Sequence, residues 1–140
     1  MGITGEYLVA AELSRRGYVA TLTLRNTRGI DILASNRDAT RSVGIQVKTA
    51  QSARPAWLMN KKAEADLAEN LLYVFVCLTP DGSADFYVVP RQVVAKYVRE
   101  SHAEFLKTPG RKGPHQDTDI RQYNDPTREY KDRWDLLGLG

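Results

Sequence analysis

The stretches Gly29-Ile30-Asp31-Ile32-Leu33 and Gly44-Ile45-Gln46-Val47-Lys48 each interrupt a short apolar run with polar side chains. Both runs favour β-strands. On a strand, residues two apart share a face, so Gln46 and Lys48 point one way and Val47 points the other way. Polar groups cost free energy when they are buried without partners, so an Asp, a Gln and a Lys on adjacent strands indicate a site. A metal ion held beside a lysine is one explanation of this arrangement.

The residues before these strands favour a helix. Thr4 is a suitable N-cap, Glu6 places a carboxylate in the first turn, and Gly17 is a natural stop. After the helix, segments of β-forming residues alternate with turn-forming residues, which is typical of an antiparallel meander. Strands are predicted at residues 18–24, 30–34 and 41–49.

The following residues are predicted to complete a mixed sheet with helices to either side. An almost unbroken apolar run at 71–78 indicates a strand that is buried on both faces. A strand at 85–89 follows a turn at 79–83. The other predicted elements are a polar connection over 50–62, a short helix over 61–69 and a helix from Pro90 to about residue 98. The resulting order is αβββαββα, which is a mixed α/β fold.

The C-terminal third is predicted to lie outside a core domain of residues 1–106. Residues 107–126 are rich in Gly, Pro and polar residues, which favours a flexible basic and polar loop. Residues 127–140 are predicted to include a helix over 127–137, with Tyr130, Trp134 and Leu137 along one side. We expect that side to pack on the core or on a partner chain.

The composition is that of a globular domain, and the distribution of charge suits a polyanionic partner. Of 140 residues, 42% are hydrophobic and 26% are charged, which is the ordinary globular range. The net charge is +3, but residues 1–59 hold eight Lys or Arg against four Asp or Glu. This positive excess lies in the segment that carries the candidate site, which suits a nucleic acid.

Several features indicate a cytoplasmic protein. No stretch reaches the roughly 18 apolar residues that span a membrane, and the first residues lack the pattern of a secretory signal. The single cysteine, Cys77, cannot form an internal disulfide, which agrees with a reducing compartment. Its apolar surroundings predict a small core residue.

The set of Asp31, Gln46 and Lys48 resembles the PD-(D/E)XK nuclease superfamily, in which an Asp is followed by an acidic-x-Lys pair on the next strand. The opening helix, from Gly5-Glu6 to Arg16-Gly17, looks like that of the archaeal Holliday-junction resolvase and Mrr-type branches. Gln46 departs from the usual acid, although Mrr-type members also use Gln-x-Lys. The resemblance covers about residues 4 to 50. It implies a restriction-endonuclease-like αβββαβ core, here with an added hairpin strand and C-terminal helices.

The resemblance implies a DNA endonuclease that uses Mg²⁺ or Mn²⁺ and forms a homodimer, with branched or modified DNA as a substrate class. Asp31 would be the principal metal ligand, and the other ligands would be Glu6, the side-chain oxygen of Gln46 and the backbone carbonyl of Val47. Lys48 would orient the attacking water and offset charge in the transition state. An amide at position 46 removes one negative charge, which we expect to weaken metal binding and to favour one metal over two.

Basic residues near these elements are candidate contacts to DNA phosphates. They are Arg25, Arg28, Lys61, Lys62, Arg111 and Lys112. Each is also explained as ordinary surface charge.

The candidate site residues have simpler explanations too. Asp31 follows Gly29 and fits a turn-capping residue, Lys48 fits a solvated strand end, and Glu6 fits an ordinary first-turn acid. The alternative function is a weak or inactive nuclease-fold module, which binds nucleic acid or a protein partner through its C-terminal helix. The two hypotheses differ in whether Asp31 binds Mg²⁺ or Mn²⁺.

Overall fold

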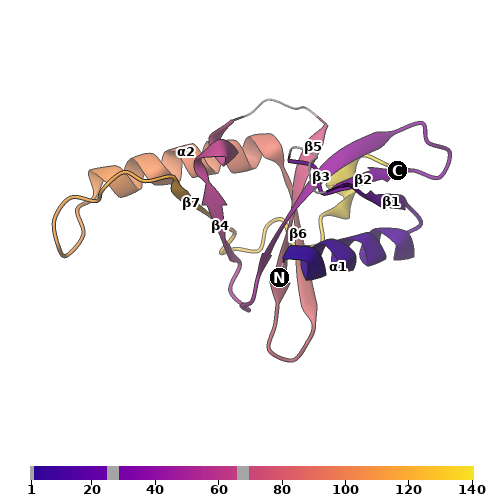
Figure 1. The fold of residues 1–140 in the computed structure, drawn as a ribbon, viewed down its shortest axis with the longest axis horizontal. Coiled ribbons are helices and arrows are strands. Elements are labelled where there is room, and N and C mark those ends of the chain that lie inside the picture. Colours follow the sequence, from indigo (N-terminus) through magenta and orange to yellow (C-terminus); the bar gives the residue numbers. More distant parts are fainter. Residues whose placement is uncertain (1, 25–28, 66–69) are drawn as a thin grey trace.

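A five-stranded mixed sheet forms the centre of the computed structural model, which describes residues 2–24, 29–65 and 70–140 (Figure 1). The strand order is β1-β2-β3-β5-β6, in which β3 and β5 are parallel and the other neighbours are antiparallel. The strands are β1 (Val19–Leu22), β2 (Ile32–Ser35), β3 (Ser42–Ala50), β5 (Leu71–Leu78) and β6 (Ala84–Pro90). The predicted mixed α/β fold is confirmed.

One face of the sheet is covered by helix α1 (Gly2–Arg15) and by the C-terminal segment (Figure 1). The helix buries Gly5, Val9 and Leu13, which recur at intervals of four and so form one stripe. Trp134 and Leu137, from the short 3-10 helix η2 (Trp134–Leu137), pack against the same aliphatic core.

The opposite face is covered by a second, two-stranded sheet and by helix α2 (Arg91–Lys107). The small sheet pairs β4 (Ala56–Asn60) with β7 (Ile120–Asn124), and the 3-10 helix η1 (Lys61–Glu64) follows β4 directly. The core here is rich in aromatic rings, and the Trp57 indole donates a 2.9 Å hydrogen bond to the Val76 carbonyl. Cys77 belongs to this core, as its apolar surroundings predict.

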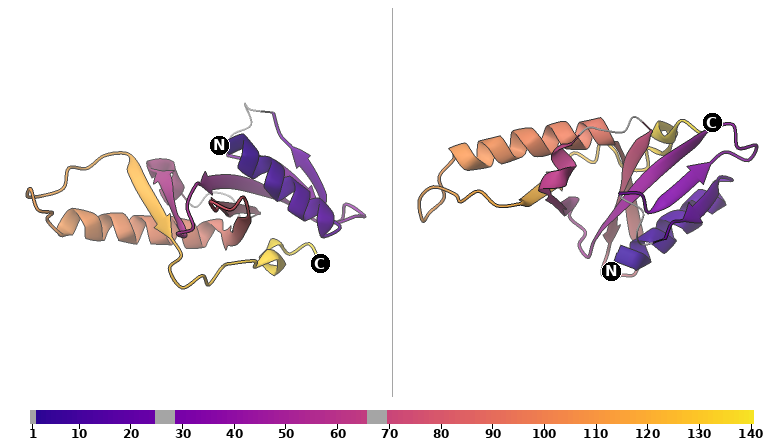
Figure 2. Two further views of the ribbon diagram at one scale, coloured as in Figure 1. Left: turned by 90° about the horizontal axis from the view of Figure 1, so that it is seen from below. Right: turned by 45° about the horizontal axis from the view of Figure 1, so that its top comes forward.

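Helix α2 reaches well beyond the central sheet (Figure 2). Its C-terminal half and the loop that follows form an arm, defined here as residues 101–119. Within the arm, the rings of Phe105 and His115 are stacked with centroids 3.9 Å apart. In the described part of the chain, no helix combines the length and the apolarity that a bilayer crossing requires.

Two predictions for the middle of the chain are wrong. The connection over 50–62 contains β4, because alternating residues Trp57 and Met59 reach the aromatic core once β7 lies alongside. The helix over 61–69 is a 3-10 turn that ends at Glu64, since Ala65 is already extended at φ −81° and ψ 139°. The rest of that predicted helix, residues 66–69, lies outside the described residues.

The predictions for the C-terminal third also need correction. The loop over 107–126 includes β7, a strand that depends on its partner β4. The helix over 127–137 is limited to η2, because Arg128 and Asp132 adopt left-handed φ angles of 57° and 56° that interrupt a helix. The structure therefore shows no C-terminal helix with a free apolar side, and it buries Trp134 and Leu137 in the core of the chain itself.

Candidate functional site

The Asp31 carboxylate lies where β2 begins beside β3. The Val47 amide donates a 2.8 Å hydrogen bond to Asp31 Oδ2, and the Asp31 amide donates to the Ile45 carbonyl at 2.8 Å. By accepting the hydrogen bond from the Val47 amide, the Asp31 carboxylate extends the hydrogen-bonded pairing of β2 and β3 by one residue. The N–H and C=O groups of a strand residue point to the same side, so the Val47 carbonyl faces this edge as well.

Gln46 and Lys48 project from β3 toward the face that α2 covers. In the parallel pairing Gln46 lies beside Tyr73 and Lys48 lies beside Phe75. Residues in register share a face, and both aromatic residues belong to the core under β4 and α2. Val47 packs in the other core, under α1, as the alternation predicts.

Gln46 and Lys48 line a pocket of about 830 Å³ between β3, η1 and the start of α2. The other lining residues are Gly29, Met59, Asn60, Lys62, Ala63, Ala65, Tyr73 and Arg91. Gly29 brings the chain just before Asp31 next to the pocket, and a β-carbon there would lie 3.9 Å from the Gln46 side-chain oxygen. Asp31 is not one of the lining residues, but its carboxylate is hydrogen-bonded to Val47, the residue between Gln46 and Lys48.

Glu6 approaches the same end of β3 from the side of α1. It is half-buried and follows Gly5, which packs so closely on Thr49 that a β-carbon would overlap the Thr49 hydroxyl. Because Thr49 follows Lys48, the first turn of α1 lies at the part of β3 that carries the site.

The candidate phosphate contacts lie in two separate regions. Lys62 lines the pocket and Lys61 is exposed beside it. Arg111 and Lys112 are exposed in the arm, in a turn closed by hydrogen bonds between Gly110 and Gly113. Arg25 and Arg28 lie outside the described residues.

Two pocket residues, Arg91 and Tyr73, were not predicted from the sequence. Arg91 is the first residue of α2, and its Nε donates a 3.1 Å hydrogen bond to the Ala65 carbonyl. Nothing in the local sequence marks Arg91 as a site residue. Tyr73 breaks the aliphatic run of β5, and its place beside Gln46 follows only from the parallel register of β3 and β5. Burial raises the pKa of the Tyr73 phenol, so this group stays protonated and can donate a hydrogen bond.

The donor atoms around Asp31 match a hard divalent cation in kind. Carboxylate, amide and backbone carbonyl oxygens are the ligands that Mg²⁺ accepts, and it usually keeps several waters. Within residues 2–24, 29–65 and 70–140, no three His, Cys, Asp or Glu side chains gather as a metal cluster.

Comparison with known proteins shows a likeness of fold. No family model matches the chain, and no curated protein matches it either. The structure is similar to that of Archaeoglobus fulgidus Hjc, a Holliday junction resolvase from an archaeal hyperthermophile. That pair has a TM-score of 0.57 and 12% identity over 99% of this chain and 97% of the other. The chain has a nuclease-like α/β fold.

A second solved structure, the bacterial homing endonuclease I-Ssp6803I, is similar to the same extent. It has a TM-score of 0.56 and 15% identity over 97% of this chain and 87% of the other. Both likenesses extend over almost the whole chain, so the small sheet and α2 belong to the compared region as well as the five-stranded sheet.

Proposed function

We propose that the protein is a metal-dependent DNA endonuclease that hydrolyses phosphodiester bonds. The observation that carries this proposal is the Asp31 carboxylate fixed on the Val47 amide, beside a cationic pocket lined by Gln46 and Lys48. The likeness in fold to a Holliday junction resolvase and a homing endonuclease supports it. Branched DNA is accordingly among the first substrates to test.

The site residues have distinct roles in this proposal. Asp31, Glu6, the Gln46 side-chain oxygen and the Val47 carbonyl would hold one Mg²⁺ or Mn²⁺, which when bound polarises a phosphoryl oxygen and activates a water. The bond from the Val47 amide fixes the orientation of the Asp31 carboxylate. Lys48 places an ammonium group in the pocket, where it would orient the water and offset the negative charge that develops on the phosphoryl group.

A cleavage assay with Lys48→Ala tests this function. Supercoiled plasmid, linear duplex, single strands and a four-way junction are incubated with Mg²⁺, Mn²⁺ or EDTA. We expect wild-type cleavage that needs the metal, and a loss of about 100-fold or more in the Lys48→Ala and Asp31→Ala variants. Lys96→Ala is the matched control, because Lys96 is an exposed lysine of α2 that does not line the pocket.

Two results would contradict the proposal. One is a wild-type protein that cuts none of the four substrates, and the other is a Lys48→Ala variant that cuts as fast as the Lys96→Ala control. Cleavage that continues in EDTA would contradict the metal-dependent step alone.

A second candidate function is a nucleic-acid-binding module without catalysis. The observation that favours it is the neutral amide of Gln46 at the position where an acid would strengthen metal binding. This candidate predicts DNA binding in EDTA with no cleavage under any of the conditions above. The homodimer expected from the superfamily is a separate prediction, which light scattering on the purified protein tests.

A further inference from the structure

Three cationic side chains from three different elements line the pocket. They are Lys48 of β3, Lys62 of η1 and Arg91 of α2, and none of the described residues that line the pocket is an Asp or a Glu. Like charges gathered in one concave site raise the local positive potential and attract anions. The catalytic role proposed for Lys48 explains one of the three charges. The charges of Lys62 and Arg91 have no role in that proposal.

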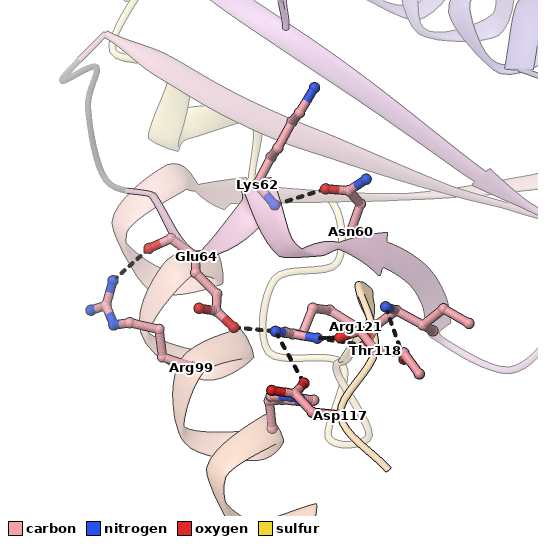
Figure 3. A network of polar contacts seen from close by, with 9 residues as sticks. Asn60, Lys62, Glu64, Arg99, Asp117, Thr118 and Arg121 are labelled. Carbon is pink, nitrogen blue, oxygen red and sulfur yellow. Dashed lines mark hydrogen bonds and ion pairs between the residues drawn. The ribbon is translucent and has the colours of Figure 1, made fainter.

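The wall that carries Lys62 is fixed at both ends. The Lys62 amide donates a 2.7 Å hydrogen bond to Asn60 Oδ1, and the Arg99 guanidinium donates to the Glu64 carbonyl at 2.8 Å. The Glu64 carboxylate forms a 2.6 Å ion pair with Arg121, which is only 5% exposed. Figure 3 shows the Lys62 side chain pointing away from this network. A wall held in this way loses little conformational freedom when a ligand binds.

Arg91 and Tyr73 supply further directional donors to the pocket. The bond from Arg91 Nε to the Ala65 carbonyl fixes the guanidinium, and this planar group carries more N–H donors than that bond uses. Two parallel N–H groups match two oxygens of one phosphate. The Tyr73 side chain, in a residue only 2% exposed, lines the same pocket and adds a neutral O–H donor.

We propose that Lys62, Arg91 and Tyr73 form a phosphate-binding subsite that holds a DNA phosphate adjacent to the one at Lys48, without a metal ion. The identity of the ligand as DNA rests on the proposed function. The choice of a phosphate rests on the pocket itself, since two cations and a phenol favour a multivalent oxyanion. Arg91 is then a positioning residue, because it fixes the strand and leaves the reacting atoms to Asp31 and Lys48.

Binding in EDTA tests the subsite apart from any cleavage. The affinity of a fluorescent oligonucleotide is measured by anisotropy over a series of salt concentrations, for wild type, Arg91→Gln, Lys62→Gln and Lys96→Gln. We expect Arg91→Gln and Lys62→Gln each to weaken binding by about tenfold and to reduce the salt slope by about one. Lys96→Gln removes the same charge from the exposed part of α2 and should bind like wild type.

The test separates this subsite from the proposed nuclease. The subsite is overturned if either Lys62→Gln or Arg91→Gln keeps wild-type affinity, or if Lys96→Gln loses as much as they do. Lys62→Gln alters only an exposed side chain, so loss of folding does not confuse its result. If binding depends on Arg91 but no substrate is cut, the subsite is supported and the nuclease proposal is contradicted. If the protein cuts DNA with Mg²⁺ but Arg91→Gln binds like wild type, the nuclease proposal is supported and the subsite is contradicted.

The source of the phosphate is resolved by paired oligonucleotides of one sequence. One carries a 5′-phosphate and the other a 5′-hydroxyl, and inorganic phosphate serves as competitor. Equal affinity that depends on Arg91 assigns the subsite to an internal backbone phosphate, and a preference for the 5′-phosphate assigns it to a strand end. Both results support a phosphate subsite. If Arg91→Gln binds the two oligonucleotides as tightly as wild type does, the subsite is contradicted.

Discussion

The charge of the candidate metal site is set largely by the residue at position 46. The Asp31 carboxylate already gives one oxygen to the Val47 amide, and Gln46 offers only a neutral oxygen beside it. Affinity for hard cations rises with the number of charged ligands. In the proposed metal site, an amide at this place would leave the substrate phosphate to complete the coordination of the ion.

Restoring a carboxylate at position 46 should strengthen metal binding. We expect Gln46→Glu to bind Mn²⁺ about tenfold more tightly than wild type, because it adds a charge beside Asp31. Isothermal titration in the absence of DNA measures this directly. Gln122→Glu is the control, since Gln122 is an exposed residue of β7 away from the pocket. Equal Mn²⁺ affinity in the Gln46→Glu and Gln122→Glu variants would remove Gln46 from the metal site.

At the scale of single elements, the position of α1 depends on its contact with β3. Gly5 faces the Thr49 hydroxyl so closely that no side chain fits between them. The contact sets how near the first turn of the helix comes to the strand that carries Gln46 and Lys48. A side chain at position 5 would therefore force α1 and β3 apart or distort one of them.

Gly5→Ala should destabilise the protein by about 1–3 kcal/mol, because an added methyl group overpacks the contact with Thr49. Urea unfolding measures the free energy change. Gly2→Ala is the matched control in the same helix, since a β-carbon there meets nothing within 4 Å. Alanine favours a helix over glycine, so Gly2→Ala should be neutral or slightly stabilising. If Gly5→Ala is as stable as Gly2→Ala, helix α1 can move away from Thr49 without a loss in the free energy of unfolding.

The elements that the sequence predicted well are those with a strong local pattern. The apolar run at 71–78 matches β5, and alternation placed Gln46 and Lys48 on one face and Val47 on the other. β4 and β7 each have only five residues, and they pair across a long stretch of sequence. The local sequence does not predict a strand of this kind, because its stability depends on the distant partner strand. Arg91 was missed for the same reason, since only the packing of α2 beside η1 brings it to the pocket.

At the scale of the whole molecule, the arm extends away from the five-stranded sheet (Figure 2), and it includes the exposed Arg111 and Lys112. His102 and Asp117 are hydrogen bonded at 2.9 Å across its base, and this bond holds the pKa of the Asp117 carboxyl below its usual range. The stacked rings of Phe105 and His115 give the loop further support. If the protein binds DNA as proposed, the arm would place Arg111 and Lys112 beside a duplex that extends past the pocket.

If the arm contacts DNA, the contribution of Arg111 and Lys112 to binding should depend on the length of the DNA. A double variant, Arg111→Gln with Lys112→Gln, should weaken binding of a long duplex and lower its salt slope by up to about two. It should leave unchanged the binding of a short oligonucleotide that fills only the pocket. Anisotropy with both ligands makes the comparison. An equal loss for the short and the long ligand would show that the two residues act through stability rather than through contact.

Both hydrophobic cores are completed by residues near the C-terminal end of the described chain. Tyr123 closes the aromatic core, Trp134 and Leu139 close the aliphatic one, and Arg121 pairs with the Glu64 that fixes the pocket wall. Synthesis on the ribosome proceeds from the N-terminus, and such distant contacts form late. A nascent chain that still lacks these residues has an incomplete core on each face of its sheet, and Glu64 of the pocket wall lacks its Arg121 partner. The growing polypeptide should thus depend on chaperones until residues 120–139 have emerged.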